Sequence, residues 1–471
     1  MHKVRSYRAI VEYAPVVLIW ISILVFFLAK YEDLFLPFYW DALGVYGPGI
    51  LHMVDNGIGF LPSALPPELS RGHPLLFYYL FASYVTVFKF SLFKIHLLAF
   101  SISIGLVLSV RYVGSQFFNK WIALLSSVAL MLIPNFFSIS AMILPEIIIA
   151  LSVLFGLYFC YKKHWLRYFI VCAIGILTKE SAIVIPVASA FFVLLFSQYR
   201  TFKNLLFSLS PLLVFAGFLI IQKIQNGWYL FPWHVQLMSY DFIRIKTTFY
   251  TCVNMLFIAQ GRTLLTIFIA SGLIPYLINF KKNNCNRIHP FICLAFIFSA
   301  GFVCFSALNI YMDRYLLSIL PLLVLIFGFS LKAWIKFSGK KYWIPALVAL
   351  LFAIYPLTKY GQDEFKFDQD INFRDVVSVQ MSATKYIEDR VVENEEVYAN
   401  FPLYFGLKDV RYGYLSSRDS LDVYSVIKDS MRWIAVMEPS PVSIQSLNLD
   451  TSKIDKVFER GCAKAVVFKM R

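Results

Sequence analysis

Apolar runs alternate with short basic connections along the first three quarters of the chain. A helix needs about 17 to 25 mostly apolar residues to cross the hydrocarbon core of a membrane. Most of the runs have about this length. The pattern therefore predicts a polytopic α-helical membrane protein with about 11 spans, near residues 11–29, 95–113, 119–138, 145–161, 166–178, 181–198, 204–222, 263–280, 290–308, 315–336 and 341–358.

The apolar run from Pro74 to Phe90 decides on which side every later connection lies. If this run does not cross, the connections on the side of the N-terminus carry 17 Lys and Arg residues, whereas the opposite short connections carry only Lys179 and Arg314. Cytoplasmic loops are enriched in Lys and Arg. We therefore expect an interfacial or re-entrant helix within a first outer loop of about residues 30–94, and an N-terminus in the cytoplasm.

The long apolar runs end before Lys359, where mixed charged and polar sequence begins. This change predicts two domains, a transmembrane domain over residues 1–358 and a small soluble α/β domain over residues 359–471. After an odd number of spans the second domain lies outside the plasma (bacterial inner) membrane, in the periplasm or extracellular space. Its periodicity predicts a helix over Arg374–Val392 and strands over Glu396–Asn400, Trp433–Met437 and Ala463–Phe468.

Composition agrees with a membrane protein, because 59% of the 471 residues are hydrophobic and only 15% are charged. The formal net charge is +15, but the cations fall largely in short connections, so we expect no nucleic-acid partner. The seven cysteines lack the paired spacing of a disulfide framework or a zinc site. The first run follows a basic start without a small-residue cleavage site, which indicates a retained signal anchor.

Charged residues interrupt the apolar pattern at the predicted outer ends of spans. Ionisable groups at such depth are costly, and they often mark a reaction site or a transport pathway. Each also has a structural explanation, since a buried ion pair can simply fix helix packing. The residues concerned are Asp41, Glu146, the neighbours Lys179 and Glu180, and the neighbours Asp313 and Arg314.

Structural roles remain open for each of these groups. Asp41 is placed to cap a helix that begins at Ala42. Glu146 follows Pro145 at the start of a span, where an acid complements the helix dipole. Lys179 and Glu180 are placed to form a local ion pair, and Arg314 to pair with Asp313 at the membrane interface.

Five segments in register resemble a known family, the GT-C type glycosyltransferases. The nearest groups are the dolichyl-phosphate-mannose protein mannosyltransferases and the lipid A aminoarabinose transferases, and the resemblance extends to about residue 358. Family members begin the first loop with Asp-Glu, where this chain has Asp41-Ala42, and many have Pro-Asp where it has Pro145-Glu146. The segments are YGPGILHMVDNG, GHPLLFYYLFA, ILPEIIIALSVLFGLYF, GILTKESAIVIPVA and DRYLLSILPLLVL.

The resemblance implies transfer of a sugar from a polyprenyl-phosphate donor to a glycan, lipid or protein acceptor at the extracytoplasmic face, with inversion. We expect Asp41 to be the catalytic base, with a pKa raised by partial burial. We expect Glu146 to face it across a cavity and orient donor or acceptor. No cofactor or metal ligand is assigned, and a divalent cation is left open. The candidates for binding the donor phosphate or sugar are Arg71, His73, Lys179, Glu180 and Arg314.

Two other functions are considered. An O-antigen polymerase or ligase would normally place its functional Arg residues in a large late outer loop, whereas the longest loop here comes first. Intramembrane charges also occur in lipid or ion transporters and flippases, although these usually show an internal repeat, which is not seen here.

The aromatic loop GWYLFPWHVQLMSY contains Trp228, Tyr229, Trp233 and Tyr240. These side chains form either an interfacial belt or the flanks of a groove for the donor.

Overall fold

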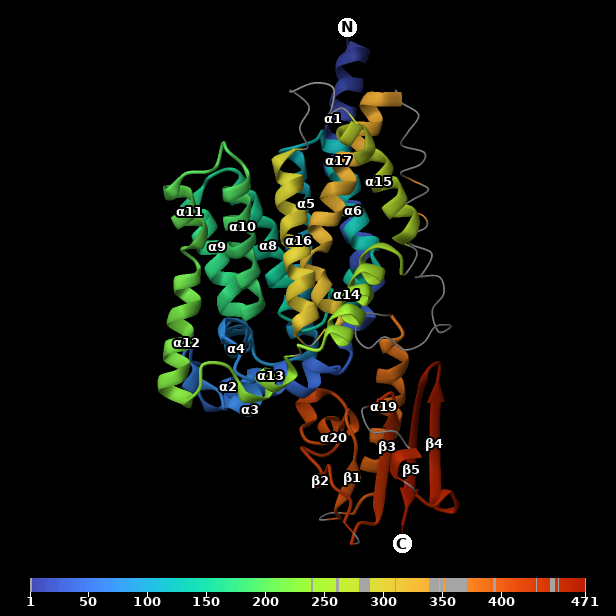
Figure 1. The fold of residues 1–471 in the computed structure, drawn as a ribbon. Coiled ribbons are helices and arrows are strands. Elements are labelled where there is room, and N and C mark those ends of the chain that lie inside the picture. Colours follow the sequence, from blue (N-terminus) through green and yellow to red (C-terminus); the bar gives the residue numbers. More distant parts are fainter. Residues whose placement is uncertain are drawn as a thin grey trace.

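The computed structural model combines a helical bundle with a small domain at one end of it (Figure 1). The N-terminus lies at the opposite end of the bundle. The structure describes residues 2–278 except 239, 260 and 261, residues 289–338 except 310, residues 347 and 351, and residues 371–470 except 393, 394, 429, 441–444 and 448. The predicted span 341–358 and the predicted domain boundary at 358 therefore fall almost wholly outside the described residues.

The bundle consists of apolar helices, as the run pattern predicts. Four segments are long and apolar enough to cross a membrane, namely Tyr13–Lys30, Leu92–Ser115, Phe202–Asn226 and Pro290–Leu308. Shorter apolar helices pack beside them, so the helical membrane fold is confirmed while the number of spans stays a prediction. The helices are α1 (His2–Lys30), α5 (Leu92–Ser115), α6 (Lys120–Leu132), α7 (Pro134–Ile139), α8 (Glu146–Tyr161), α9 (Trp165–Thr178), α10 (Val184–Leu195), α11 (Phe202–Leu209), α12 (Leu212–Asn226), α14 (Phe242–Phe257), α15 (Arg262–Ile278), α16 (Pro290–Leu308) and α17 (Leu320–Ser338).

Some helices keep an apolar face open to the surroundings. On α1, Trp20, Leu24 and Leu28 are each more than half exposed. Exposed apolar rows of this kind suit contact with lipid tails. Helices α14 and α15 meet at a bend of 82°.

The first loop folds into short helices at one end of the bundle. They are η1 (Glu32–Phe35), η2 (Ala42–Tyr46), α2 (Gly47–Asn56), η3 (Pro62–Ala64), α3 (Pro67–Ser70) and α4 (Leu76–Phe88). In Figure 1, α2, α3 and α4 lie together below α9, at the end that carries the small domain. The 13 residues of α4 cover about 20 Å, too short to cross about 30 Å of hydrocarbon. This length agrees with an interfacial helix, and the sidedness of the loop stays a prediction.

The small domain is α/β, as predicted. Its sheet has the order β2-β1-β3-β5-β4, with β1 parallel to β2 and β3 and the other pairs antiparallel. Helix α19 packs on β4 and β5. The predicted helix and three strands are confirmed, whereas β2 and β4 were not predicted. The elements are α19 (Phe373–Glu388), β1 (Val397–Ala399), α20 (Leu403–Gly406), β2 (Val423–Tyr424), β3 (Trp433–Glu438), β4 (Ile454–Arg460) and β5 (Ala463–Lys469).

Candidate active site

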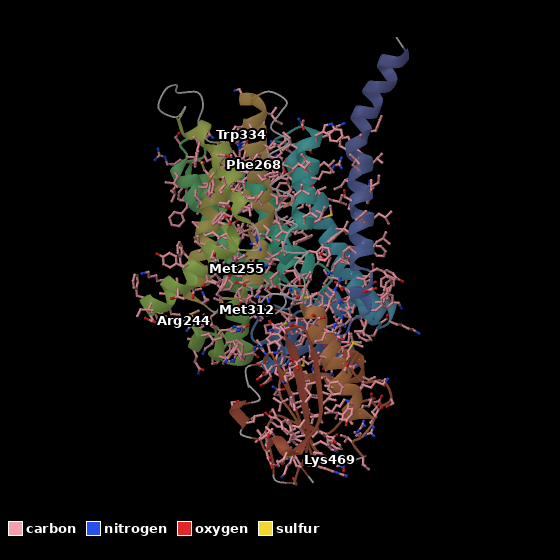
Figure 2. The ribbon with its side chains drawn as sticks, turned by 90° about the vertical axis from the view of Figure 1, so that its right-hand side faces the viewer. Arg244, Met255, Phe268, Met312, Trp334 and Lys469 are labelled. Carbon is pink, nitrogen blue, oxygen red and sulfur yellow. The ribbon has the colours of Figure 1, made fainter. Side chains whose placement is uncertain are left out.

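A cavity of about 590 Å³ lies at the end of the bundle that faces the small domain. Its size is within the range of about 300 to 1,000 Å³ that is usual for small-molecule sites. Figure 2 shows one of its lining residues, Met312, near the junction with the domain that carries Lys469. Six of the seven predicted site residues line the cavity, namely Asp41, Arg71, His73, Glu146, Lys179 and Glu180.

The seventh predicted residue, Arg314, joins two of the acids. It lies in the short helix η6 (Asp313–Ser318), and its Nη2 donates a hydrogen bond to Oδ2 of Asp41. Its Nε lies 3.5 Å from Oε1 of Glu146. The Nζ of Lys179 donates to the same Oε1 at 3.0 Å. The structure therefore brings Asp41 and Glu146 into one ion-pair network.

The two acids differ in access to the cavity. The side chains of Glu146 and Arg314 are each 1% exposed, whereas that of Asp41 is 24% exposed. A ligand in the cavity can therefore reach Asp41 more readily than Glu146. Glu146 begins α8, so its charge also complements the dipole of that helix.

The backbone around Asp41 is unusual. Trp40 has a φ of 49°, in the left-handed region that costs a bulky residue about 1–3 kcal/mol. Asp41 precedes the π-helical turn η2, a form that is rare and often found at functional sites. The Asp41 carboxylate makes no capping hydrogen bond, so the helix-cap explanation for this residue is wrong.

The expected pKa of Asp41 is also wrong. Burial alone would raise the pKa of Asp41, but the positive charges of Arg314, Arg71 and Lys179 outweigh it. They hold the pKa below its usual value. The sequence predicts that this acid is partly buried, but it cannot show how many cations lie close to it.

Arg71 is the cation placed most openly for a ligand. It lines the cavity, and its guanidinium carbon lies 5.4 Å from the ring centroid of Trp233. Among the described residues, no carboxylate lies within ion-pair distance of Arg71. The left-handed backbone at Arg71, with a φ of 47°, turns the chain there at the end of α3.

His73, Glu180 and His234 form a second polar cluster in the cavity wall. The Nδ1 of His73 lies 2.9 Å from Oε2 of Glu180, and the two histidine rings lie 5.0 Å apart. His234 belongs to α13 (Pro232–Leu237), and Phe231, just before this helix, lies close to Gly72. A Cβ on Gly72 would come within 2.7 Å of Phe231.

This cluster fits a divalent cation such as Zn²⁺. Potential ligand atoms of the three residues all lie within 4.8 Å of one another. Burial opposes ionisation of Glu180, in the connection after α9, but His73 outweighs it and lowers the pKa of Glu180 to about 2. Burial and His73 lower the pKa of His234 to about 4, so its ring is neutral at pH 7. Neutral imidazole and ionised carboxylate are the ligand forms that zinc requires.

Distant residues pair with the charged groups for which local ion pairs were proposed. Lys179 pairs with Glu146, and Glu180 pairs with His73. Arg314 pairs with Asp41 and Glu146.

The aromatic loop divides between its two proposed roles. Trp233 lines the cavity, together with Phe231 and His234. Tyr240 is 87% exposed and Tyr229 is 55% exposed, as suits residues at a membrane interface. His234 was not predicted, because a histidine inside an aromatic segment gives no separate signal.

Comparisons with known proteins agree with the predicted resemblance. Residues 72–221 match a family model described as dolichyl-phosphate-mannose-protein mannosyltransferase. No curated protein sequence matches the chain. The resemblance to GT-C glycosyltransferases is therefore confirmed.

Two solved structures share the fold over nearly the whole chain. The crystal structure of ArnT from Cupriavidus metallidurans bound to undecaprenyl phosphate has a TM-score of 0.62 at 13% identity, covering 97% of this chain and 98% of that chain. Its apo state has a TM-score of 0.59 at 10% identity, covering 98% of each chain. The archaeal oligosaccharyltransferase AglB from Archaeoglobus fulgidus, in complex with an inhibitory peptide and a dolichol-phosphate, has a TM-score of 0.45 at 12% identity, covering 91% of this chain and 70% of that chain.

Proposed function

We propose that this protein transfers a sugar from a polyprenyl-phosphate donor to an acceptor hydroxyl or amine at the extracytoplasmic face of the membrane. The observation that carries the proposal is the network of Asp41, Arg314 and Glu146 at one side of a cavity of about 590 Å³. The family match over residues 72–221 supports sugar transfer, and the undecaprenyl phosphate bound to ArnT supports a lipid-phosphate donor.

The cations of the site suit the phosphate of such a donor. A polyprenyl-phosphate sugar is a phosphodiester with one negative charge, and the leaving polyprenyl phosphate gains a second charge as the bond to the sugar breaks. Arg71 lines the cavity and can bind the phosphate oxygens through two hydrogen bonds of its guanidinium, and the buried Arg314 adds its positive charge from behind Asp41. Lys179 adds positive charge behind them through its contact with Glu146.

Asp41 acts as the base in this proposal. The acceptor oxygen or nitrogen forms a bond to the anomeric carbon, and the carbon–oxygen bond to the phosphate breaks on the opposite face. The acceptor proton passes to the Asp41 carboxylate, and one such displacement inverts the anomeric carbon. A bound donor phosphate also draws positive charge away from Asp41, which raises the proton affinity of this carboxylate when it is needed.

Glu146 is a positioning residue in this proposal rather than a second base. Its side chain is 1% exposed and contacts both Lys179 and Arg314. Although Glu146 lines the cavity, its carboxylate is already held by these two cations and is poorly accessible to a bound acceptor. It can hold the two cations at the places where they meet Asp41 and the donor phosphate.

The extracytoplasmic placement rests on the distribution of Lys and Arg. The cavity, the first loop and the small domain all lie at the same end of the bundle (Figure 1). The predicted cytoplasmic connections carry the 17 cations counted in the sequence. A lipid or ion transporter is less well supported, because the charges line a cavity at one end of the bundle rather than a path through its middle.

The test is sugar transfer by the full-length protein in lipid nanodiscs. Radiolabelled polyprenyl-phosphate sugars are offered with membrane glycolipids, glycans and peptides as acceptors, and labelled product is extracted. We expect product from the wild type and none above background from Asp41→Asn at equal protein amount. Absence of product together with substrate flux into proteoliposomes would replace the proposal with the transporter.

A further inference from the structure

The segment that leads into Asp41 is held on three consecutive residues by the small domain. The backbone N–H of Phe38 donates to the carbonyl of Tyr412 at 3.0 Å, and the Phe38 carbonyl accepts from the hydroxyl of Tyr414 at 2.9 Å. Both polar backbone groups of Phe38 are thus bonded to one domain. This fixes the path of the chain two peptide units before Trp40.

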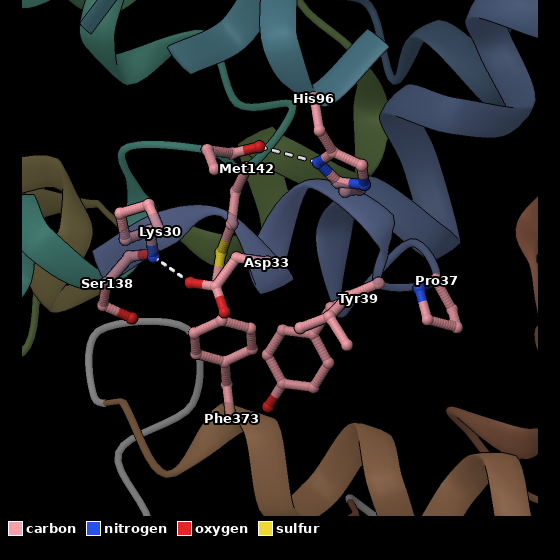
Figure 3. Close-up of a pocket in the computed structure, with 11 residues that line it drawn as sticks. Lys30, Asp33, Pro37, Tyr39, His96, Ser138, Met142 and Phe373 are labelled. Atoms are coloured by element: carbon pink, nitrogen blue, oxygen red, sulfur yellow. Dashed lines mark hydrogen bonds and ion pairs between the residues drawn. The ribbon is translucent and has the colours of Figure 1, made fainter. Parts of the chain in front are cut away.

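The next two residues meet aromatic side chains of the same domain. The ring of Tyr39 lies 5.6 Å from that of Phe373 at the start of α19, and Figure 3 shows the two side by side. The ring of Trp40 lies 4.8 Å from that of Phe401, at an angle of 85°. Edge-to-face pairs at this distance are favourable.

Phe401 makes its contacts at the rim of the cavity. Among the described residues of the small domain, it is the one that lines the cavity. It also lies against Gly44, where a Cβ would come within 3.2 Å of the Phe401 ring. Phe401 therefore touches the chain on both sides of Asp41.

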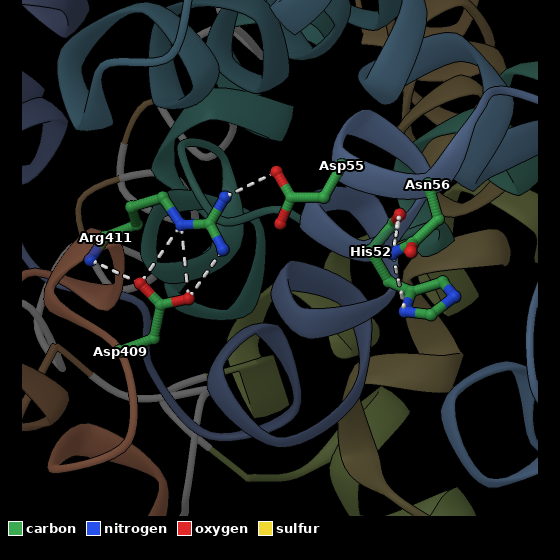
Figure 4. A network of polar contacts seen from close by, with 5 residues as sticks. All are labelled: His52, Asp55, Asn56, Asp409 and Arg411. Carbon is green, nitrogen blue, oxygen red and sulfur yellow. Dashed lines mark hydrogen bonds and ion pairs between the residues drawn. The ribbon is translucent and has the colours of Figure 1, made fainter. Parts of the chain in front are cut away.

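Ion pairs tie the domain to the first loop around this contact. Arg411 pairs with Asp55 of α2 at 2.9 Å and also with Asp409, as Figure 4 shows. Arg374 pairs with the buried Asp33 at 2.7 Å. Along the first loop, Asp33 precedes and Asp55 follows the residues that Phe401 contacts. The small domain is therefore attached to the first loop at several points.

We propose that Phe401 is a positioning residue that holds Trp40 in its left-handed backbone conformation and thereby places Asp41 against Arg314. A bulky residue keeps such a conformation only where its surroundings enforce it. The rings of Phe401 and Tyr39 both pack on Trp40, and of these two residues Phe401 belongs to the small domain. The consequence for catalysis rests on the proposed function, whereas the consequence for the Phe38–Gly44 segment does not.

The test compares Phe401→Ala with a matched control, Phe458→Ala, in the full-length protein. Phe458 is also partly buried in the small domain and packs edge-on against one aromatic ring, that of Tyr386 at 5.5 Å. It does not line the cavity. A third variant, Phe401→Tyr, keeps the ring and serves as the conservative rescue.

Hydrogen exchange followed by mass spectrometry gives a readout that does not depend on activity. We expect the amides of residues 38–44 to exchange about tenfold faster in Phe401→Ala than in the wild type, because local opening becomes easier. We expect no change there in Phe458→Ala or Phe401→Tyr. Equal exchange at 38–44 in Phe401→Ala and the wild type would overturn the proposal whether or not the protein transfers sugar.

Steady-state kinetics give the second readout. We expect kcat of Phe401→Ala to fall by about tenfold to a hundredfold with a similar donor KM, since a small misplacement of a reacting group costs that much. A rise in acceptor KM with unchanged kcat would overturn the proposal, because Phe401 would then bind the acceptor instead. If the wild type transfers no sugar while exchange at 38–44 responds as expected, the proposed function fails and the positioning of the segment stands.

Discussion

Asp41 and Arg314 stand 273 residues apart in the sequence and share a hydrogen bond in the cavity wall. Asp41 comes from the loop after the first helix, and Arg314 comes from the turn that precedes α17. The pair therefore joins an early and a late part of the bundle. Because Arg314 also contacts Glu146, its guanidinium is the centre of the network.

Replacing Arg314 by Lys should lower kcat/KM by about tenfold to a hundredfold. The lysine ammonium is a compact charge, so it cannot reproduce the planar guanidinium, whose several N–H donors can contact two carboxylates and a phosphate at once. Initial rates of sugar transfer in nanodiscs measure the effect, with Arg432→Lys as a control on an exposed ion pair of the small domain. Equal rates in Arg314→Lys and the wild type would show that only the charge matters.

Replacing Glu146 by Gln should destabilise the protein more than replacing Asp41 by Asn. The first change leaves buried Lys179 and Arg314 without their shared carboxylate, which costs about 3–5 kcal/mol for a buried pair. Asp41 is partly exposed, so Asp41→Asn should keep stability within about 1 kcal/mol and lose activity by about a hundredfold or more. Thermal unfolding in detergent and transfer rates separate the two effects. Equal loss of stability in Glu146→Gln and Asp41→Asn would contradict the separate roles of the two acids.

Replacing Arg71 by Gln should raise the donor KM by about tenfold, because this cation lacks a carboxylate partner among the described residues and faces the cavity. The acceptor KM should stay within about twofold. Kinetics with each substrate varied in turn measure the two constants. An unchanged donor KM would remove Arg71 from the phosphate site.

The cluster of His73, Glu180 and His234 should bind about one Zn²⁺ per chain, as its His, Glu and His donors suit this ion. Metal analysis after dialysis measures the content, and a chelator should remove it. We expect His234→Ala to lose the metal and His52→Ala to keep it, since His52 bonds to Asn56 on α2 (Figure 4). Equal zinc content in both variants would refute the site.

The stability of the small domain should fall at acid pH through Glu388. Its carboxylate accepts from the backbone N–H groups of Ser416, Ser417 and Arg418, and these bonds outweigh burial and lower the pKa of Glu388 to about 2. A lowered pKa contributes stability above the ordinary value of about 4.3, and this contribution disappears as pH falls toward 2. Calorimetry between pH 2 and 6 should therefore show a weaker pH dependence in Glu388→Gln than in the wild type. An identical pH dependence would exclude this carboxylate.

The sequence predicts which charged residues matter but not how they pair. Polar residues that interrupt apolar runs point to Asp41, Glu146 and Arg314. The partners of Lys179 and Glu180 depend on backbone shape, because Lys179 is extended with a φ of −161°. Glu180 begins the short helix η4 (Glu180–Ile183), so the backbone changes direction between the two residues, and Lys179 reaches Glu146 while Glu180 reaches His73.

Strand β4 and His234 were missed for different reasons. In Ile454–Arg460 almost every side chain is exposed, so the alternation that marks a half-buried strand is absent. The role of His234 becomes visible only in the folded structure, where its loop contacts Gly72. Neither burial at a sheet edge nor contact between distant loops can be read from local periodicity.

The contacts of the small domain with Phe38, Tyr39 and Trp40 have a consequence for the order in which the protein folds during synthesis. Helices enter the bilayer as they leave the ribosome, so the first loop is delivered long before the aromatic ring of Phe401 has been synthesised. Until that ring arrives, its contact with Trp40 cannot form. A nascent chain would therefore enter the membrane before this contact forms, and the proposed sugar transfer would begin only after translation has passed Phe401.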